Sequence, residues 1–288
     1  MPESVGPAMS PSLGYYLGLP AWAFPGWAGE YFPGGAALQA YSGVFNTVEG
    51  NTTFYRVPDA ATVDRWREAV SGTEFRFSFK LPRTVTHERR PDWDDLARFM
   101  AVMEPLAEHL GPFLVQCPAT LGPEALPFLQ QLFERLPAGH RYALEVRHRE
   151  FFRRPEMLEP LLGQTGAGRV MFDSRPIYHE DTQHPEVLAA RHQKPDVPLL
   201  DEVYNGLVYA RVVLHPDARH NGKYVEDWLQ RCSTYLDAGH TVYFMMHCPN
   251  NQHCPAFARD FHSALRRQLK GKIPDLPAWP MPQQESLF

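Results

Sequence analysis

Residues 124–147, EALPFLQQLFERLPAGHRYALEVR, contain a helical segment, a turn and a short apolar strand in succession. Apolar residues in the first part recur at the spacing of an amphipathic helix, and the run at 143–147 is typical of a buried strand. The same alternation of strand and helical segment recurs along the chain. The predicted strands cover residues 15–19, 47–51, 76–80, 113–116, 143–147, 169–173, 207–213 and 241–247.

Eight strands, each followed by a helix or a long crossover, predict an α/β fold with parallel pairing: a single (β/α)8 TIM-barrel-like domain over residues 15–272. A chain of 288 residues with 44% hydrophobic content suits one such domain. Residues 1–14 are expected to form a flexible arm, and residues 273–288 an extended, proline-rich tail. The polar stretch at 179–198 is expected to be a long loop after the sixth strand.

The composition narrows the choice of partners. A formal net charge of -5 provides no overall basic surface, so any contact with nucleic acid would need a local basic groove. No apolar run is long enough to cross a membrane, and the first residues, MPESVGPAMSPSLG, do not form a secretory signal. Four cysteines without such a signal predict reduced thiols in a cytoplasmic protein.

Polar residues end most of the predicted strands, which is where a parallel barrel carries its functional groups. Acidic side chains within buried strands are rare unless they are paired or used. The candidate catalytic residues are Glu49, Glu145 and Asp173, and the candidate ligand- or phosphate-binding residues are Asn51, Lys80, Arg147, Arg175 and Arg211. Further strand-end residues are Arg83, His87, Gln116, His148, Ser174, His215, His247 and Asn250. The alternative is a salt-bridge network that only closes the barrel mouth.

No cofactor is identified, but a divalent metal ion is a possible ligand. Glu145, Asp173 and His247 could form an oxygen-rich metal site of the kind that cleaves phosphoesters. The stretch HCPNNQHC at 247–254 contains two His and two Cys, but like residues stand six apart, which does not match zinc-site spacing. Glycine-rich nucleotide-binding motifs and a serine-hydrolase elbow are absent from the sequence.

Six motifs in order resemble the YecE-like family, a bacterial domain of unknown function. They are GLPAW at 18–22, FNTVEGNTTFY at 45–55, RWRE at 65–68, FRFSFKLPRTVTH at 75–87, LEVRHREFF at 144–152 and DSRP at 173–176. The resemblance implies a TIM-barrel-like fold, and it places seven residues at the family's polar barrel mouth: Glu49, Asn51, Lys80, Glu145, Arg147, Asp173 and Arg211. The chain departs from the family after Arg211 and before Asn250, where His-Gly and Asn-Asn are common.

The last five residues, QESLF, resemble the short motif by which bacterial replication and repair proteins bind the DNA sliding clamp. Gln284, Ser286, Leu287 and Phe288 match the motif, and Glu285 stands where Leu is commonest. Leu287 and Phe288 would fill an apolar pocket, and a proline-rich leash would hold the peptide away from the barrel. The alternative is a tail that folds back onto an apolar patch.

Three classes of function follow from these residues. In the first, a hydrolase- or phosphodiesterase-type barrel acts on DNA or a phosphorylated fragment of it, with Lys80, Arg147 and Arg211 on phosphate and Glu145 and Asp173 as base or metal ligands. In the second, an enzyme acts on a sugar or sugar phosphate, and Glu49 and Glu145 move protons beside Lys80. In the third, the barrel binds a ligand without turning it over.

Overall fold

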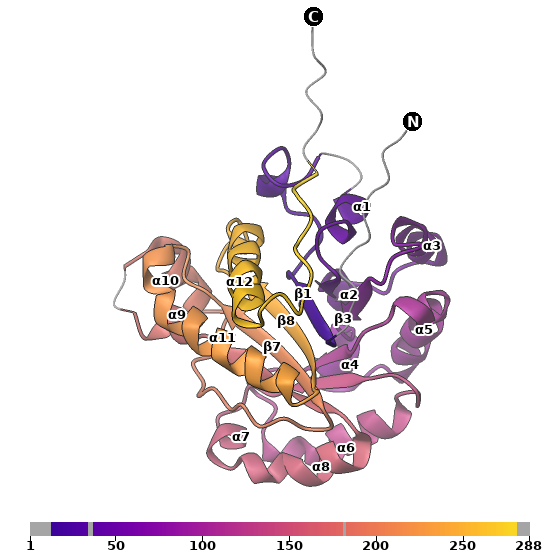
Figure 1. Ribbon diagram of the computed structural model, residues 1–288. Helices are drawn as coiled ribbons and strands as arrows, with labels where there is room; N and C mark the ends of the chain where they lie inside the picture. Colours follow the sequence, from indigo (N-terminus) through magenta and orange to yellow (C-terminus); the bar gives the residue numbers. More distant parts are fainter. Residues whose placement is uncertain (1–12, 34–36, 181–182, 281–288) are drawn as a thin grey trace, which may run out of the picture.

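The computed structural model describes residues 13–33, 37–180 and 183–280 (Figure 1). Its centre is a curled parallel sheet of six strands in the order β1-β8-β7-β6-β5-β4, and β2 and β3 form a second parallel sheet. The strands are β1 (Tyr15–Gly18), β2 (Thr47–Gly50), β3 (Arg76–Phe79), β4 (Phe113–Gln116), β5 (Tyr142–Glu145), β6 (Gly168–Asp173), β7 (Leu207–Val213) and β8 (Thr241–His247). The eight predicted strands are therefore confirmed to within two residues at each end.

The two sheets meet at two junctions, where single contacts replace a strand ladder. Between β1 and β2, the side chain of Asn46 accepts a hydrogen bond from Leu17 N (2.8 Å) and donates one to Tyr15 O (2.9 Å). Between β3 and β4, Phe77 and Lys80 form isolated parallel bridges with Leu110 and Leu114. The continuous eight-stranded sheet that the sequence predicts is thus divided in two, with the Asn46 side chain bonded to the backbone of β1 at one junction and isolated bridges at the other.

Helices follow the strands and lie outside the sheets (Figure 1). The α-helices are α1 (Ala37–Ser42), α2 (Thr52–Tyr55), α3 (Ala60–Ala69), α4 (Arg83–Thr86), α5 (Trp93–Met103), α6 (Leu126–Arg135), α7 (Glu150–Arg153), α8 (Glu159–Thr165), α9 (Arg175–Tyr178), α10 (Pro185–Arg191), α11 (Gly222–Asp237) and α12 (Cys254–Gln268). The short 3-10 turns are Pro25–Trp27, Glu104–His109, Pro123–Ala125, Pro155–Leu158 and Ala218–His220. No helix in the described ranges is both long enough and apolar enough to cross a membrane.

The stretch at 179–198 is expected from the sequence to be a long loop, and this is wrong for its middle part, which is helical. Helix α10 begins there at Pro185 and ends at Arg191. Proline is favourable at the first position of a helix because that residue has no intrahelical partner for an N–H group. The polar composition of the stretch therefore concealed a helix whose apolar residues, Val187 and Ala190, are buried.

The side chains of each strand alternate between two faces. On the outer face, residues such as Val208, Val242 and Phe244 pack with helix residues including Trp228 and Leu265. On the inner face, an apolar cluster contains Leu114, Ala143, Val170, Phe172, Tyr209 and Met245. The inner faces of the two sheets also contact each other, since the hydroxyls of Ser78 and Tyr209 lie 2.7 Å apart. Polar residues at inner-face positions near the carboxyl ends of the strands are thereby directed toward a common centre.

Residues 273–280 are not held away from the barrel as a leash: they pack against the domain, as in the alternative of a tail that folds back (Figure 1, yellow). Ile273 and Leu276 are buried, and Trp279 lies under the guanidinium of Arg259 at 3.9 Å. Arg259 also donates a hydrogen bond to Pro277 O (2.6 Å). These apolar residues recur every third position, which is the period of a polyproline II segment. The packed domain therefore extends to residue 280 rather than 272, and the QESLF motif lies outside the described residues.

Candidate functional site

Arg211 on β7 forms the centre of a buried ion cluster. Its Nε and Nη2 atoms donate to Oε2 and Oε1 of Glu49 on β2, both at 2.7 Å, so the pair is bidentate. Its Nη1 atom donates to Oε2 of Glu145 on β5. All three side chains are at most 4% exposed. One guanidinium therefore joins carboxylates from two separate sheets at the carboxyl ends of their strands.

The two carboxylates are held in the ionised form. Burial alone would raise the pKa of Glu145, but the charges of Arg211 and Arg147 outweigh it and lower the pKa to about 2. Burial likewise opposes ionisation of Glu49, and the charge of Arg211 brings its pKa well below the usual range. Arg147 Nε donates to Glu145 Oε1 at 2.6 Å. Neither carboxylate is available as a proton donor near neutral pH.

Lys80 follows β3 on the inner face, and it has no partner carboxylate in the described part of the chain. Its ammonium lies 3.5 Å from the centroid of the Phe54 ring, and the residue is 7% exposed. Burial lowers its pKa first, and the positive charge of Arg211 lowers it further, to about 7. Lys80 is thus a buried amine that loses its proton near neutrality.

Lys194 also reaches the cluster, and sequence reasoning missed it. It lies just after α10, and burial together with the charges of Arg211 and Arg147 lowers its pKa to about 8. Glu49 and Glu145 act on it in the opposite direction. No pattern in the sequence separates this lysine from other polar residues of its loop. Only the folding of the segment after α10 toward the strand ends brings it there.

Two histidines border the cluster in their neutral forms. His247 Nε2 lies 3.4 Å from Glu49 Oε2 without hydrogen-bond alignment, and burial lowers its pKa to about 4. His87 makes an edge contact with Phe54, with 4.8 Å between ring centroids. Burial and the charge of Lys80 lower the pKa of His87 to about 4. Neither ring adds positive charge to the site at neutral pH.

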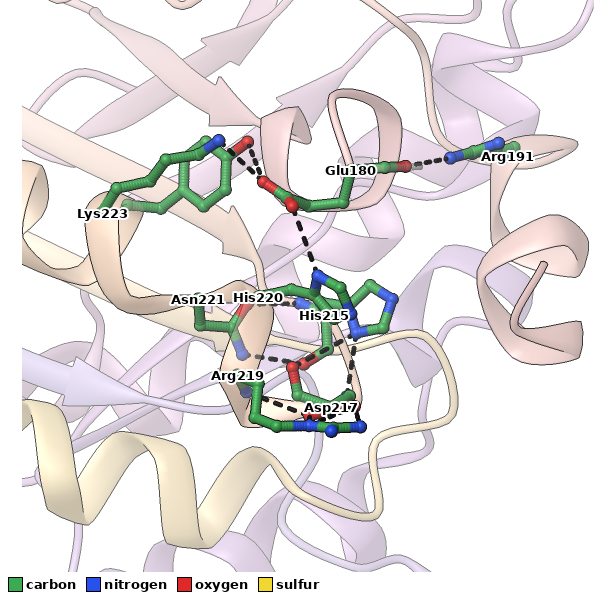
Figure 2. A network of polar contacts seen from close by, with 9 residues as sticks. Glu180, Arg191, His215, Asp217, Arg219, His220, Asn221 and Lys223 are labelled. Carbon is green, nitrogen blue, oxygen red and sulfur yellow. Dashed lines mark hydrogen bonds and ion pairs between the residues drawn. The ribbon is translucent and has the colours of Figure 1, made fainter. Parts of the chain in front are cut away.

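A basic groove of about 720 Å³ opens beside the cluster. Arg147, Arg149, Arg191 and Lys194 line it, together with Tyr178 and Asp196 among others. The guanidinium of Arg191 donates to the backbone oxygens of Ile177 (2.6 Å) and Glu180 (3.2 Å), and the second of these bonds is drawn in Figure 2. Backbone carbonyls fix this side chain without neutralising its charge. The groove is therefore richer in positive than in negative charge.

Asp173 and Arg175 do not join the cluster, contrary to the expectation from the sequence. Asp173 accepts hydrogen bonds from Trp228 Nε1 (2.7 Å) on α11 and from Arg175, which also binds Asp227. Its neighbour Phe172 faces inward, 5.7 Å from the Arg211 guanidinium. Because successive side chains of a strand alternate, Asp173 must point to the helix layer. It serves as an anchor for α11 at this position.

The proposed metal ligands are not brought together. Glu145 is bonded to two arginines, and Asp173 lies on the opposite face of its strand. His247 lies beside Glu49, which is not one of the three proposed ligands. In the described ranges, no group of three or more His, Cys, Asp and Glu side chains has the arrangement needed for a metal ion. The set Glu145, Asp173 and His247 was therefore wrong as a joint metal site.

The other strand-end candidates divide between the cluster and separate contacts. The Asn51 amide donates to Glu49 Oε1 (2.8 Å), and Gln116 is buried beside Glu145 in the register of β4 and β5. Elsewhere, Arg83 pairs with Glu88 and Asn250 with Glu186. His215 belongs to a polar network with Asp217, His220 and Asn221, shown in Figure 2. Ser174 donates to Pro195 O, and His148 accepts from Glu150 N.

The comparisons with known proteins agree with this arrangement of strands. The model of the family described as "Protein of unknown function DUF72" matches residues 16–284. The chain belongs to the DUF72 family. It is 36% identical over 280 residues to the UPF0759 protein YecE of Escherichia coli K12, covering 95% of this chain and 99% of that protein. The same identity and coverage hold for YecE of Escherichia coli O157:H7.

Solved structures of two DUF72 family proteins share the fold. One, from Enterococcus faecalis, has a TM-score of 0.65 and 19% identity, with 88% of this chain and 95% of that chain covered. The other, from Thermotoga maritima, has a TM-score of 0.63 and 19% identity, with 89% and 99% covered. At this identity the similarity concerns the fold alone. The resemblance to the YecE-like family is confirmed by the family model and by the identity to the two YecE proteins.

Replacing Arg211 tests the cluster as a structural element. We expect Arg211→Met to lower the free energy of unfolding by about 3–5 kcal/mol, because two buried carboxylates lose their partner. Adding Glu49→Gln and Glu145→Gln should recover part of that loss. Arg219→Met, which removes an exposed ion pair with Asp217, is the control and should have little effect. Urea denaturation measures all four proteins, and a loss below about 1 kcal/mol in Arg211→Met would contradict this role.

The low pKa of Lys80 predicts a particular pH dependence of stability. The unfolded chain holds the Lys80 proton up to a pKa of about 10.4, whereas the folded protein releases it near pH 7. Between these values the unfolded state binds more protons, so stability rises with pH. The stability difference between the parent and Lys80→Met should shift by about 2 kcal/mol in favour of the parent from pH 7 to pH 9. The exposed control Lys223→Met should show no such shift.

Proposed function

We propose that this protein binds a phosphate-bearing ligand at the carboxyl ends of its strands, in the basic groove beside the Arg211 cluster. The observation that carries the proposal is the balance of charge there. Three basic side chains, Arg147, Lys194 and Arg211, accompany only two carboxylates, Glu49 and Glu145, and Lys80, with a pKa of about 7, adds part of a further positive charge. A surplus of positive charge that is partly desolvated favours a dianion such as a phosphate group.

Arg147 and Lys194 are the residues expected to contact the phosphate. Both line the groove and belong to the cluster, and Arg147 keeps its Nη2 atom free of partners in the described residues. Arg211 has a different role, because three of its N–H groups already donate hydrogen bonds to Glu49 and Glu145. It supplies positive potential and holds the strand ends together. Arg191 adds a second positive side to the groove through a guanidinium fixed by backbone carbonyls.

The chemistry of the site favours a lysine over the carboxylates as the reactive group. A general acid or base works best when its pKa is near the working pH. Glu145 has a pKa of about 2, whereas Lys80 has one of about 7. Chemistry at Lys80 therefore has more support than proton transfer by Glu49 and Glu145. It also has more support than metal-assisted cleavage through Asp173. Both a free sugar phosphate and a nucleic-acid fragment carry a phosphate group that this site could bind. Binding of such a ligand without turnover is the third class of function.

We also propose that the two sheets act as one closed (β/α)8 barrel around this site. Glu49 N donates to Leu19 O (3.0 Å) at the first junction, and Leu81 N donates to Leu114 O (3.0 Å) at the second. The Arg211–Glu49 pair joins β7 to β2 across the interior. Such closure would place the strand ends of both sheets at one face, where TIM-barrel proteins carry their sites.

Phosphate titration tests the proposed site. Inorganic phosphate should bind the parent protein at pH 7 and more weakly at pH 9, because Lys194 and Lys80 lose their protons between these values. Arg147→Met and Lys194→Met should each reduce affinity at least about tenfold, as expected for loss of a charge-assisted bond. Lys223→Met is the exposed control. Calorimetry in which both variants bind phosphate like the parent would overturn the proposal.

The two sources of phosphate are separated by parallel titrations with ribose 5-phosphate and a 5′-phosphorylated oligonucleotide. Preference for the oligonucleotide, with an affinity that falls steeply with salt, would favour the nucleic-acid class. Preference for the sugar phosphate with weak salt dependence would favour the small-molecule class. Binding of either without any chemical change would make the protein a ligand-binding adaptor.

We further propose that Gln284, Ser286, Leu287 and Phe288 bind a bacterial DNA sliding clamp. The support is the QESLF sequence and its position, four residues beyond Pro280, where the described packing ends. The full-length protein should bind the clamp, and a chain ending at residue 283 should lose at least about tenfold in affinity, as expected for removal of two apolar anchors. Leu287→Ala with Phe288→Ala should behave like the truncation. Equal binding by all forms, or by none, would contradict the motif.

A further inference from the structure

The environment of Lys80 is unusual for a structural lysine. The side chain is almost fully buried, yet none of the ion pairs of the described residues involves it. Its amine lies over the face of Phe54. Burial and the charges of Arg211 and Arg147 disfavour a positive charge on it, and together they outweigh the charges of Glu145 and Glu49, which favour one. Burying a cation without a partner is costly, so a lysine in this position is better accommodated as the neutral amine. A neutral lysine amine is a nucleophile.

The position of the amine also suits a reaction. Lys80 directly follows β3, and its backbone is fixed on both sides: its N–H donates to Gly50 O (3.2 Å), and its carbonyl accepts from the Thr53 hydroxyl (2.7 Å). The Nζ atom is not completely covered, since it is absent from the fully buried side-chain atoms that lack a hydrogen-bond partner. It belongs to the same charged cluster as Arg147, which lines the basic groove. Lys80 itself does not line the groove, so the proposal requires a ligand that extends from a phosphate bound at Arg147 to this amine.

We propose that Lys80 forms a Schiff base with an aldehyde or ketone that carries a phosphate close to its carbonyl group. This rests on the proposed phosphate site, which selects and orients the substrate. Phe54 provides the apolar face against which the amine is held. The chemical class is therefore a phosphorylated carbonyl compound, and the covalent partner is a single lysine at the end of β3.

The step balances without any co-reactant. Nζ of Lys80 adds to the carbonyl carbon, and the carbonyl oxygen then leaves as water. The two protons of the neutral amine depart with that oxygen, which leaves a neutral imine, and the imine then takes one proton from the solvent to become an iminium ion. The charges of Glu49 and Glu145, which favour a cation at this nitrogen, stabilise the iminium. The iminium withdraws electrons from the adjacent carbon and activates its bonds for cleavage or proton loss.

Two kinds of substrate are phosphorylated carbonyl compounds of this class. A free sugar phosphate in its open-chain form is a phosphorylated aldehyde or ketone. A deoxyribose that has lost its base within a DNA strand is also an aldehyde flanked by phosphates. Both present a carbonyl near a dianion or phosphodiester, and the same lysine and groove would serve either. The experiment therefore includes one arm for each.

Reductive trapping on the full-length protein tests the proposal. The protein is incubated with glycolaldehyde phosphate and cyanoborohydride, which delivers a hydride to the imine carbon and leaves a stable secondary amine on the lysine. Peptide mapping by mass spectrometry should find the adduct on Lys80, formed more than roughly ten times faster at pH 7 than on the exposed Lys223, Lys270 and Lys272. With glycolaldehyde, which carries no phosphate, the rate at Lys80 should rise through pH 7 and then level off. Adducts spread over the exposed lysines, with Lys80 unmodified, would overturn the proposal.

Matched variants and ligands separate this inference from the phosphate site. Lys80→Arg keeps a cation but cannot form an imine, so it should give no adduct at position 80, whereas Lys194→Arg should still be trapped at Lys80. Because the map is read on the parent protein, the test does not depend on the folding of either variant. Glycolaldehyde without phosphate should react at Lys80 at least about tenfold more slowly, and inorganic phosphate should slow only the phosphorylated probe.

The outcomes are distinct. Phosphate binding without an adduct at Lys80 would overturn the Schiff base and leave the phosphate site standing. Equally fast trapping of both glycolaldehydes would support the lysine and overturn the phosphate site. In the DNA arm, an oligonucleotide with a natural abasic site should crosslink to Lys80 if DNA is the source, and its tetrahydrofuran analogue, which has no aldehyde, should not. Trapping of the free phosphorylated aldehyde alone would assign the small-molecule source.

Discussion

The bidentate bond between Arg211 and Glu49 is the interaction on which the rest of the site depends. It joins β7 of the six-stranded sheet to β2 of the two-stranded sheet, and the third contact of Arg211 adds Glu145 from β5. Each of these groups would be costly to bury alone, and together they satisfy one another. The cluster thereby fixes the relative position of strand ends that belong to two sheets, where hydrogen-bonded ladders are replaced by single contacts.

The same interaction sets the electrostatics around it. Because Arg211 and Arg147 keep Glu145 ionised and occupied, the carboxylates leave Lys80 without an ion-pair partner. Burial and the guanidinium groups lower the pKa of the nearby amines, and this effect exceeds the opposite effect of Glu49 and Glu145. A region of this kind can gain from binding an anion and can also hold a neutral amine. The proposed phosphate groove and the proposed reactive lysine are two consequences of one arrangement of charge.

The limits of prediction from the sequence are clearest at Asp173. The strands were located correctly, and Glu49, Lys80, Glu145, Arg211 and His247 do share the inner face at the strand ends. Strand β6, however, is buried on both faces, so its apolar run has no visible phase. A polar residue at its end could point either way, and the pleat directs Phe172 inward and Asp173 toward Trp228. The metal site failed for this reason and because Glu145 is bonded to Arg147 and Arg211.

The sequence by itself determined the number and order of the strands, the family and the residues that end each strand, because these depend on local hydrophobic patterns and on motifs. The tertiary structure decided which of those residues meet. It brought in Lys194 from a loop without periodicity, and it packed residues 273–280 against Arg259. It also divided the parallel strands into two sheets. Such outcomes depend on contacts between segments far apart in the chain, and no local pattern encodes a contact whose partner lies elsewhere.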